Sequence, residues 1–489
     1  MERKNLITLI TLETVIGLEI HVQLNTKSKI FSYDHNDFGN KPNSDVGAIT
    51  LAHPGTLPMI SREVIDMAMK LGIALKGTIN RNLIFDRKNY FYPDLPKGYQ
   101  ITQDATPICK GGIVKIRNDD FPHFDVELTK IHLEEDAGKS IHVQNTDFTN
   151  VDLNRSGVPL LEIVTEPMIT CSEEAGLCLI ELRKLVRFLG ISDGNMEQGS
   201  LRCDANISVR LPGAPLGTKV EVKNMNSIKN VRKAIDYEVE RQTKMIADGR
   251  AIISETRTYN TKKNTTSGMR KKELLNDYRY FPEPDISPIV ISDEWFESVE
   301  KSLPVLPDQV KKTLIEDYGL PNFDANILSY DRLMATYFFK TAAVCKYYKV
   351  ISNWIMGPVK SYLNENEIRI DSLSLPPSKL ADLINAVQQK EISHSDATQQ
   401  AFKYLLKYPH VEVEEAILIL GLAQVDDFDG IKQLIENVLA DHTDKVKEYH
   451  NGKKGIISMF MGLIMKQSVD RINPEKVNVM IKETLDKTK

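Results

Sequence analysis

The sequence predicts an α+β protein in which a domain built on an antiparallel sheet is followed by helices. Up to about residue 292, short runs of alternating apolar and polar residues are separated by Gly, Pro and Asn; beyond it, nearly every segment has the apolar period of an amphipathic helix. The 489 residues are 42% hydrophobic and 26% charged, as in a globular chain of several domains. We therefore predict a sheet domain over 1–292, an all-α helical domain over 293–423 and a small all-α tail domain over 424–489.

The first predicted strand covers residues 14–24. From Ile16 onward every second residue is aliphatic, so these residues share one face of the strand. Glu19, His21 and Gln23 then lie together on the opposite face. This strand therefore brings a carboxylate and an imidazole to the same side of the sheet.

Residues 81–103 combine basic and aromatic side chains. Four basic residues, Arg81, Arg87, Lys88 and Lys97, alternate with five aromatic ones, and two prolines disfavour a helix. Basic groups for phosphate beside aromatic faces for unstacked bases are typical of proteins that bind single-stranded nucleic-acid ends. A rigid aromatic loop packed on the core remains an open alternative.

Two further runs carry carboxylates. In residues 130–136, His132 and Glu134 share a face, whereas Glu135 falls on the apolar face or lies beyond the strand. Glu162 interrupts the apolar run VPLLEIV, where a buried carboxylate is costly unless a cation or donors satisfy it. A metal ion is one interpretation, and an ion pair with an arginine such as Arg155 is another. Carboxylates with imidazole and no cysteine suit Mg²⁺ or Mn²⁺ better than structural zinc.

The sequence predicts two helices within the sheet domain. The first runs from Thr170 to Gly190, with Thr170 and Glu173 as a capping box and Gly190 as the stop. The second begins after Ser227, which we expect to be its N-cap residue. Beyond the proline-rich segment 281–288, amphipathic helices follow to the C-terminus.

Residues 200–210 and 218–223 predict two more strands with one polar face each. In both, apolar residues alternate with Ser, Arg, Asp, Asn, Lys or Glu. A solvated antiparallel sheet explains one such strand, but three of them side by side favour a concave site lined by functional groups.

Charge and cysteine usage exclude several classes of protein. The net charge of −5 argues against coating nucleic acid by bulk charge, although residues 445–489 contain ten Lys and Arg against five Asp and Glu. That local excess fits either RNA-backbone contact or a solvated face. Five scattered cysteines without a CxxC pair, no leader and no apolar run of 18 residues predict a protein of the bacterial cytoplasm or an organelle matrix, away from membranes. Gly138-Lys139-Ser140 lacks the leading glycine of a P-loop, so any ATP site belongs to a less common fold.

Seven longer blocks occur in order along the chain: TVIGLEIHVQL, DRKNYFYPDLPKGYQITQ, HLEEDAGKS, DLNRSGVPLLEIVTEP, EQGSLRCDANIS, EVKNMNS and DYRYFPEPDI. They resemble the signature blocks of the B subunit of the tRNA-dependent amidotransferase. The resemblance continues through a helical middle and a C-terminal tail. It implies a cradle-like α+β domain that carries kinase and transamidase activity, followed by helical and tail domains that hold tRNA.

The resemblance also implies a two-step reaction in a heteromeric complex. ATP phosphorylates the side-chain carboxylate of Glu or Asp misacylated on tRNA, and ammonia then displaces the phosphate to give Gln or Asn. The ammonia comes from glutamine hydrolysis in an A subunit, and a small C subunit stabilises the complex. ATP is thus a substrate, and Mg²⁺ or Mn²⁺ is the expected cofactor.

The matching residues lie largely on the polar faces described above. Those at the family's magnesium-binding positions are Glu19, His21, Glu134 and Glu162. For the cations that neutralise a transferring phosphoryl group we expect Arg155, Arg202, Lys223 and, as a further candidate, Arg279. For hydrogen bonds to nucleotide or substrate we expect Ser200, Asp204, Asn206, Asn224 and Asn226. We expect the tRNA acceptor end near Lys88 and Tyr90.

Two questions remain open at this level. A non-catalytic scaffold that positions charged tRNA for another enzyme is an alternative to the enzyme subunit. The choice between Glu-tRNA and Asp-tRNA as substrate also remains open.

Overall fold

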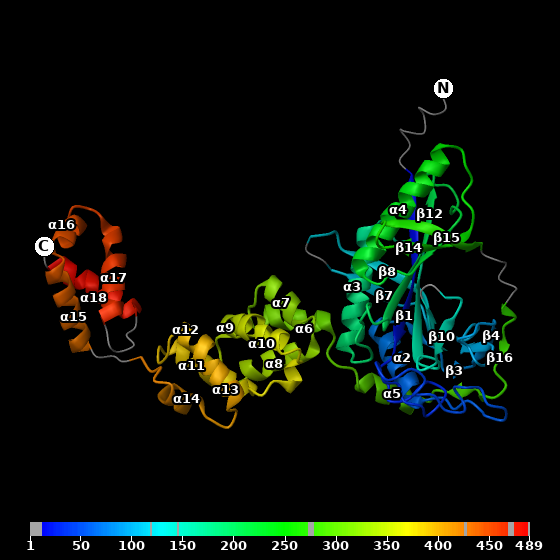
Figure 1. The fold of residues 1–489 in the computed structure, drawn as a ribbon, viewed down its shortest axis with the longest axis horizontal. Helices are drawn as coiled ribbons and strands as arrows, with labels where there is room; N and C mark the ends of the chain where they lie inside the picture. The colour runs from blue at the N-terminus through cyan, green and yellow to red at the C-terminus, as the bar shows by residue number, and fades with distance from the viewer. Residues whose placement is uncertain are drawn as a thin grey trace. The chain divides into compact units, whose positions relative to one another are not determined.

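The structure is a computed structural model that describes residues 12–117, 120–143, 146–271, 278–424, 428–467 and 474–487. By its internal contacts the chain forms two units, 1–306 and 307–489. Within the described residues all strands belong to the first unit and the second is helical (Figure 1), which confirms the predicted α+β class. The three predicted domain ranges stay a prediction. No helix of the described ranges has the length and apolar character needed to cross a bilayer.

A ten-stranded sheet forms the centre of the first unit. Along it the strands follow the order β15-β14-β13-β12-β1-β11-β8-β6-β2, and β7 also pairs with β8. Their bounds are β1 (Glu13–Gln23), β2 (Thr78–Ile79), β6 (Cys109–Lys110), β7 (Ile113–Ile116), β8 (Phe124–Glu135), β11 (Pro159–Thr165), β12 (Leu201–Arg210), β13 (Val220–Lys223), β14 (Glu255–Asn260) and β15 (Thr265–Lys271).

One pair of neighbours in this sheet is parallel, namely β13 and β14, whereas the other pairs are antiparallel. The prediction of an antiparallel sheet is therefore wrong for this pair. The reason is the helix α4 (Ile228–Ala247), which connects the two strands as a crossover, the connection that parallel neighbours require.

One face of the sheet is covered by helices. The aliphatic residues of β1, such as Leu18 and Ile20, are fully buried in one core with side chains from α2 (Arg62–Ala74), α3 (Ser172–Phe188) and α4. Helix α5 (Asp293–Lys301) packs on α2 through the ring of Trp295, whose Nε1 donates to Asp66 Oδ1 over 2.6 Å. Because side chains alternate along a strand, the polar residues of β1 lie on the face opposite this core.

The beginning of α3 differs from the prediction, whereas its end agrees with it. Cys171 is the N-cap residue, and the backbone N–H and hydroxyl of Thr170 donate to Glu174 Oε2 over 2.7 and 2.9 Å. The capping box of Thr170 with Glu173 is therefore wrong, because the helix begins one residue later. Gly190 follows the helix with a φ of 72°, as a stop requires. Ser227 caps α4 by accepting from Asn230 N, as predicted.

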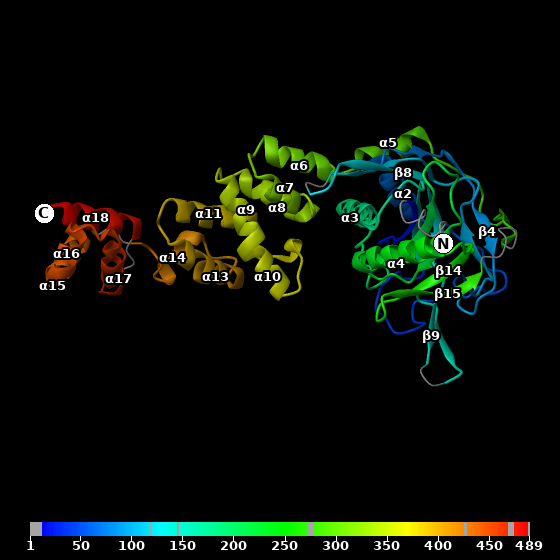
Figure 2. The same ribbon diagram turned by 90° about the horizontal axis from the view of Figure 1, so that it is seen from above.

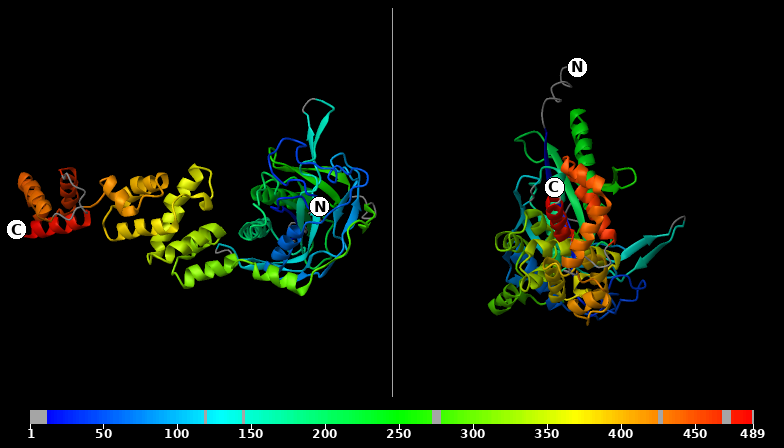
Figure 3. Two further views of the ribbon diagram at one scale, coloured as in Figure 1. Left: turned by 90° about the horizontal axis from the view of Figure 1, so that it is seen from below. Right: turned by 90° about the vertical axis from the view of Figure 1, so that its left-hand side faces the viewer.

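The proline-rich segment 281–288 and the residues after it form strand pairs with earlier strands of the sheet domain. Strands β16 (Phe281–Pro282), β4 (Asp86–Asn89) and β5 (Tyr99–Thr102) form a small sheet, and β17 (Ile289–Val290) pairs with β3 (Asn82–Leu83). The Arg87 guanidinium of β4 holds the segment after β16 in place by donating to both carboxylate oxygens of Glu283 over 2.7 and 2.8 Å. A separate hairpin, β9 (Lys139–His142) and β10 (Thr149–Asp152), extends away from the body of this unit (Figures 2 and 3).

The second unit consists of helices in the described ranges. They are α6 (Pro307–Glu316), α7 (Asn322–Leu328), α8 (Arg332–Ala342), α9 (Tyr348–Trp354), α10 (Lys360–Glu365), α11 (Pro377–Gln388), α12 (His394–Asp396), α13 (Phe402–Lys407), α14 (Val413–Ile419), α15 (Phe428–Asp441), α16 (Thr443–His450), α17 (Ile457–Gln467) and α18 (Pro474–Lys487), with π-helical turns at Ile355–Val359 and Ala397–Ala401 and 3₁₀ turns at Ile370–Ser372 and Lys454–Ile456. The helices from α15 to α18 share a hydrophobic cluster of their own.

Lys29, in the loop after β1, is fully buried, with 0% of its surface exposed. Burial lowers the pKa of its ammonium from the ordinary 10.5 to about 8, and Asp34 and Asp45 offset part of that effect. Between pH 8 and 10.5 the unfolded chain therefore binds more protons than the folded chain, so the free energy of unfolding rises with pH. The rise has a limiting slope of roughly 1.4 kcal/mol per pH unit.

We expect Lys29→Met to be more stable than the wild type at pH 7.5, because methionine has no charge to bury. The variant should also lose the part of the pH dependence of stability that comes from Lys29. Urea unfolding of the two proteins between pH 7.5 and 10 measures it, because other titrating groups cancel in the difference. The stability advantage of Lys29→Met should shrink as the pH rises; parallel curves would contradict the burial of a charged Lys29.

Candidate active site

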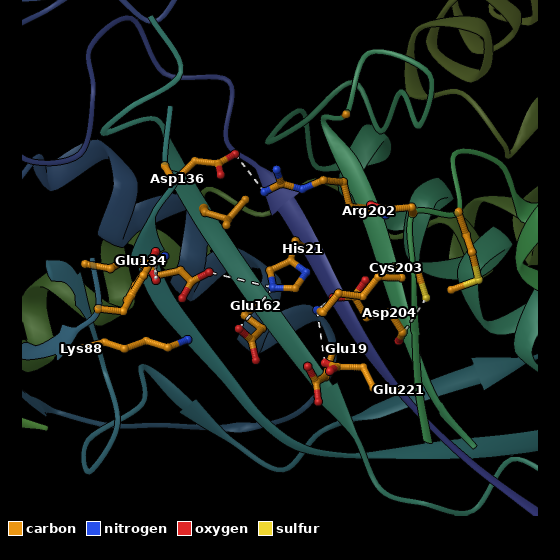
Figure 4. Close-up of a pocket in the computed structure, with 18 of the residues that line it drawn as sticks. Glu19, His21, Lys88, Glu134, Asp136, Glu162, Arg202, Cys203, Asp204 and Glu221 are labelled. Carbon is orange, nitrogen blue, oxygen red and sulfur yellow. Dashed lines mark hydrogen bonds and ion pairs between the residues drawn. The ribbon is translucent and has the colours of Figure 1, made fainter. Parts of the chain in front are cut away.

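The polar face of the sheet forms the floor of a cavity of about 1470 Å³. Strands β1, β8, β11, β12 and β13 supply the floor, and Figure 4 shows labelled residues of each of them with Lys88 of β4 at one side. The residues before β16 complete a wall at that side. Of the residues expected to bind a metal ion, the phosphoryl group, nucleotide, substrate or tRNA, those that line the cavity are Glu19, His21, Lys88, Tyr90, Glu134, Glu162, Arg202, Asp204, Lys223, Asn224, Asn226 and Arg279. Those that do not line it are Arg155, Ser200 and Asn206.

His21, Glu134 and Glu162 form a first group, which we call the histidine cluster. His21 Nε2 lies 3.3 Å from Glu162 Oε2 and 3.9 Å from Glu134 Oε1 (Figure 4). The strand register causes this proximity, because His21 of β1 is directly opposite Glu162 of β11. One ligand atom from each residue lies within 4.8 Å of the others, which is the spacing of a cation site.

A second imidazole lies beside the histidine cluster. His132 Nε2 is 3.5 Å from Glu162 Oε2 and 3.7 Å from Glu134 Oε2. Its Nδ1 is buried and has no hydrogen-bond partner in the described part of the chain. His132 thus contacts the two carboxylates from the side of β8 and restricts their orientation.

The environment shifts the pKa values of this cluster in opposite directions. Burial raises the pKa of Glu162, but the adjacent His132 and His21 more than offset burial and hold it well below its usual range. Burial lowers the pKa of His21, yet the hydrogen bond and charge of Glu162 and the charge of Glu134 raise it above its ordinary value. The raised pKa of His21 therefore reflects the negative charge that Glu134 and Glu162 bring to the cluster, the charge that a bound cation would meet.

Glu19, Asp204 and Glu221 form a second group, which we call the acidic cluster. Glu19 of β1 is directly opposite Asp204 of β12, and the Lys223 ammonium contacts both Asp204 and Glu221, the latter at 3.2 Å. The sequence placed Glu19 in one ligand set with His21, whereas the structure groups it with Asp204. Glu221 was overlooked as a ligand, although its alternation with Val220 and Val222 signalled a polar face.

Side chains around the acidic cluster hold its carboxylates in place. Asn206 Nδ2 donates to Glu19 Oε1 over 2.8 Å, and the hydroxyl of the buried Thr256 donates to Glu221 Oε2 over 2.8 Å. Asn206 thus acts on the cavity through Glu19 and does not line it. Ser200 contributes its backbone carbonyl to Gln23 N over 2.8 Å.

Two of the three predicted arginines, Arg155 and Arg202, converge on Asp136, which sequence reasoning missed. Arg202 Nη2 lies 2.8 Å from Asp136 Oδ2, and Arg155 Nε lies 3.8 Å from the same atom. Burial raises the pKa of Asp136, but these two guanidinium groups bring it below its usual range. Arg155 also donates to the carbonyls of Ala137 and Gly138 over 2.9 and 2.6 Å. Arg155 does not pair with Glu162, whose ion-pair partners in the described residues are His21 and His132, so Arg155 is not the arginine of that alternative.

Only part of the basic set of residues 81–103 serves the cavity. Arg87 is paired with Glu283, and Lys97 is paired with the buried Glu135, which also accepts from Ile101 N over 2.9 Å. Lys88 instead points its ammonium into the cavity (Figure 4). Burial lowers the pKa of Lys88, but Glu134 and other neighbours raise it above its ordinary value, so the side chain stays charged. Because Glu134 lines the cavity whereas Glu135 is paired with Lys97 outside it, Glu134 and not Glu135 belongs to the site.

Asn224 and Asn226 lie on the loop between β13 and α4. Asn224 has a φ of 65°, a backbone conformation that asparagine tolerates, and its Nδ2 donates to Thr258 Oγ1 over 2.9 Å. Asn226 Oδ1 accepts from Asn230 Nδ2 over 2.6 Å. Both side chains are fixed at the cavity edge beside the acidic cluster.

The donor set of the two clusters fits divalent cations that prefer oxygen ligands. Five carboxylates and one imidazole face the cavity, and the nearby Cys203 is no competitor, because burial raises the pKa of its thiol well above the ordinary value. Ligands of these types suit Mg²⁺ or Mn²⁺. With Lys88 and Arg202 in the same cavity, the site combines cation ligands with fixed positive charges, a combination suited to phosphoryl groups.

Known proteins resemble this chain over nearly its whole length. The family profile described as GatB/GatE catalytic domain matches residues 14–297, and the profile described as GatB domain matches residues 336–485. The B subunit of the aspartyl/glutamyl-tRNA(Asn/Gln) amidotransferase from Chlorobium limicola is 44% identical over 475 residues, which cover 97% of this chain and 99% of the relative. Proteins of the same name from Hydrogenovibrio crunogenus and Rickettsia felis are 44% and 42% identical, again over 97% of this chain and over 100% and 98% of the relatives.

Proposed function

Because the chain belongs to the family of aspartyl/glutamyl-tRNA(Asn/Gln) amidotransferase B subunits, we propose that its cavity activates and amidates an amino acid attached to tRNA. In the first step the γ-phosphoryl group of ATP moves to the side-chain carboxylate of Glu on tRNA(Gln) or Asp on tRNA(Asn), and ADP leaves. In the second step ammonia attacks the acyl carbon and phosphate departs, so that the carboxylate becomes the amide of Gln or Asn.

The observation that carries this proposal is the pair of carboxylate clusters on one polar face. His21, Glu134 and Glu162 would hold one divalent cation, and Glu19, Asp204 and Glu221 a second. A bound Mg²⁺ neutralises the charge of a transferring phosphoryl group, which is the main requirement of this chemistry. Lys88 and Arg202 add fixed positive charge from two sides of the cavity. Asp136 orients Arg202 through their 2.8 Å ion pair.

The proposal includes partners and a cellular location. Ammonia would come from a glutamine-hydrolysing A subunit, a small C subunit would stabilise the complex, and the predicted tail would contact the tRNA. We place the reaction in the bacterial cytoplasm or an organelle matrix, where aminoacyl-tRNA is available. The relatives are named as B subunits, which supports a multi-subunit enzyme.

Reconstitution tests this function directly. The chain is co-expressed with candidate A and C subunits, and the conversion of Glu-tRNA and Asp-tRNA is followed by separation of the released amino acids. We expect Gln or Asn to form only when ATP, Mg²⁺ and glutamine are all present. An assembled complex that binds tRNA but converts neither substrate would contradict the proposal.

A positioning role of Thr256 is a further testable prediction. In Thr256→Val the shape is nearly kept, but Glu221 Oε2 loses the hydroxyl that donates to it over 2.8 Å. We expect the affinity for Mn²⁺ at the acidic cluster to fall roughly 10- to 100-fold, as for other groups that orient a metal ligand. Mn²⁺ titration followed by electron paramagnetic resonance measures this change.

Thr129→Val is the matched control for this experiment. Its hydroxyl donates to Glu166 Oε1 over 2.7 Å outside the cavity, so the same chemical change is made away from the clusters. A titration of Thr256→Val that coincides with those of Thr129→Val and the wild type would show that Thr256 does not position a ligand.

A further inference from the structure

Four tyrosine rings from two distant segments form a continuous row, which we call the aromatic row. Its order is Tyr92, Tyr90, Tyr278 and Tyr280, and the successive ring centroids lie 6.0, 6.3 and 6.2 Å apart. The rings contact one another edge to face, the geometry that aromatic pairs prefer. The row therefore has a defined shape before any ligand binds.

Backbone pairing brings the two segments together. Strand β16 pairs with β4 so that Phe281 lies opposite Arg87 (both strands are labelled in Figure 1). Asn89 Nδ2 then donates to the carbonyl of Arg279 over 2.8 Å, and the Arg87–Glu283 pair fixes the strand ends. The row is thus held by contacts that do not involve its own rings.

The two middle rings of the row line the cavity, and its two ends lie outside the cavity. Tyr90 and Tyr278 line the cavity, and the Lys88 ammonium lies 5.2 Å from the ring centroid of Tyr278. The two ends of the row are open to solvent, since 50% of Tyr92 and 38% of Tyr280 are exposed. Each exposed ring beside the charged cavity offers an apolar face next to fixed positive charge.

The tyrosine hydroxyls are poor candidates for acid–base chemistry. Burial and the nearby carboxylates raise the pKa of Tyr90 far above its ordinary value, and its hydroxyl donates to Gln100 Oε1 over 3.3 Å. Burial likewise raises the pKa of Tyr280. What remains available to a ligand is the ring surface, and the ligand class that such surfaces bind is an unstacked nucleobase.

We propose that the aromatic row binds the unpaired 3′-terminal purine base of the RNA substrate. This inference rests on the proposed function. When the side-chain carboxylate of the attached amino acid lies at the clusters, its ester links it to the terminal ribose, only one short amino acid away. The base of that ribose therefore lies near the cavity wall, beside Tyr90 and Tyr278 in the middle of the row, where an exposed ring follows on either side. The adenine of ATP has the same stacking chemistry but is separated from the reacting phosphorus by two further phosphates and a ribose.

The experiment combines a protein change with an RNA change. The full-length chain, assembled with the other subunits, is titrated with tRNA that ends in its terminal adenosine and with tRNA from which that adenosine has been removed. The double variant Tyr92→Leu/Tyr280→Leu should bind the intact tRNA between roughly 5- and 150-fold more weakly than the wild type, the range of base–aromatic stacking. For the truncated tRNA the two proteins should have the same affinity.

Control variants separate stacking from general damage. Tyr92→Phe/Tyr280→Phe keeps the rings and should retain wild-type affinity, as should Phe148→Leu, which removes an exposed ring from the β9–β10 region. Loss of affinity for both tRNAs, or for neither, would overturn the inference while leaving the proposed function intact. Weaker binding of Mg-ATP with unchanged tRNA binding would assign the row to the nucleotide and also overturn it. A wild-type complex without affinity for either tRNA would instead overturn the proposed function itself.

Discussion

Replacing Glu162 by Gln is expected to lower the phosphorylation of aminoacyl-tRNA by at least roughly 100-fold, the cost of removing one group that stabilises transferring charge. Glu162 Oε2 lies 3.3 Å from His21 and 3.5 Å from His132, so it links both imidazoles to the cavity. The amide keeps the shape but carries no charge for a cation. The measurement is single-turnover transfer of the γ-phosphoryl group from labelled ATP, together with Mn²⁺ affinity, which should fall as well.

This variant distinguishes an enzyme from a scaffold. In either case the affinity for tRNA should stay unchanged, because the substitution lies at the bottom of the cavity. Glu166→Gln serves as control and should behave as the wild type, because Glu166 directly follows the same strand and accepts from Thr129 Oγ1 over 2.7 Å outside the cavity. Wild-type turnover in Glu162→Gln would favour the scaffold and show that the histidine cluster is not the reacting centre.

Glu238→Ala is expected to destabilise the first unit by about 3–5 kcal/mol, the cost of breaking a buried ion-pair network by removing one partner. The Glu238 side chain is 0% exposed and accepts from Arg241 Nη2 over 2.6 Å. Its other oxygen lies 3.5 Å from Arg257 Nε and accepts from Thr266 Oγ1 over 3.1 Å. Without Glu238, the two guanidinium groups between α4 and the β14–β15 pair lose a shared counter-ion.

Hydrogen exchange in increasing urea measures this loss in the full chain, because it reports on the first unit separately. Amides of α4 and β14 should exchange at lower urea in Glu238→Ala than in the wild type. Glu240→Ala removes an exposed carboxylate of the same helix, which is paired with the exposed Lys244, and should change stability by less than about 1 kcal/mol. Equal exchange in both variants would contradict a structural role of the buried network.

Which residues share the polar face could be predicted from the sequence, because one face of the sheet must pack on helices. Leu18 and Ile20 pack on the helices, so Glu19 and His21 of the same strand lie on the opposite face. The same argument placed Arg202 and Asp204 in the cavity. The period of a strand is strict, and burial of its apolar half decides the direction of every side chain.

The partners of these residues could not be predicted, since they depend on strand register. Only the pairing of β1 with both β11 and β12 puts His21 next to Glu162 and Glu19 next to Asp204. A single expected ligand set thereby becomes two clusters, and Glu221 joins the second. The ion pair of Arg87 could not be predicted either, because its partner Glu283 is 196 positions away in the sequence.

The long separation of Arg87 from Glu283 has a consequence for folding during synthesis. A nascent chain that has left the ribosome as far as residue 260 already contains both carboxylate clusters, but it lacks Tyr278, Tyr280 and Glu283. Closing so long a loop costs entropy that only the finished contacts repay. Synthesis from the N-terminus therefore supplies the strands that carry the two clusters first and the cavity wall that contains Tyr278 last. The proposed binding of an RNA end at the aromatic row therefore becomes possible only after the segment that contains Tyr278 and Tyr280 has emerged.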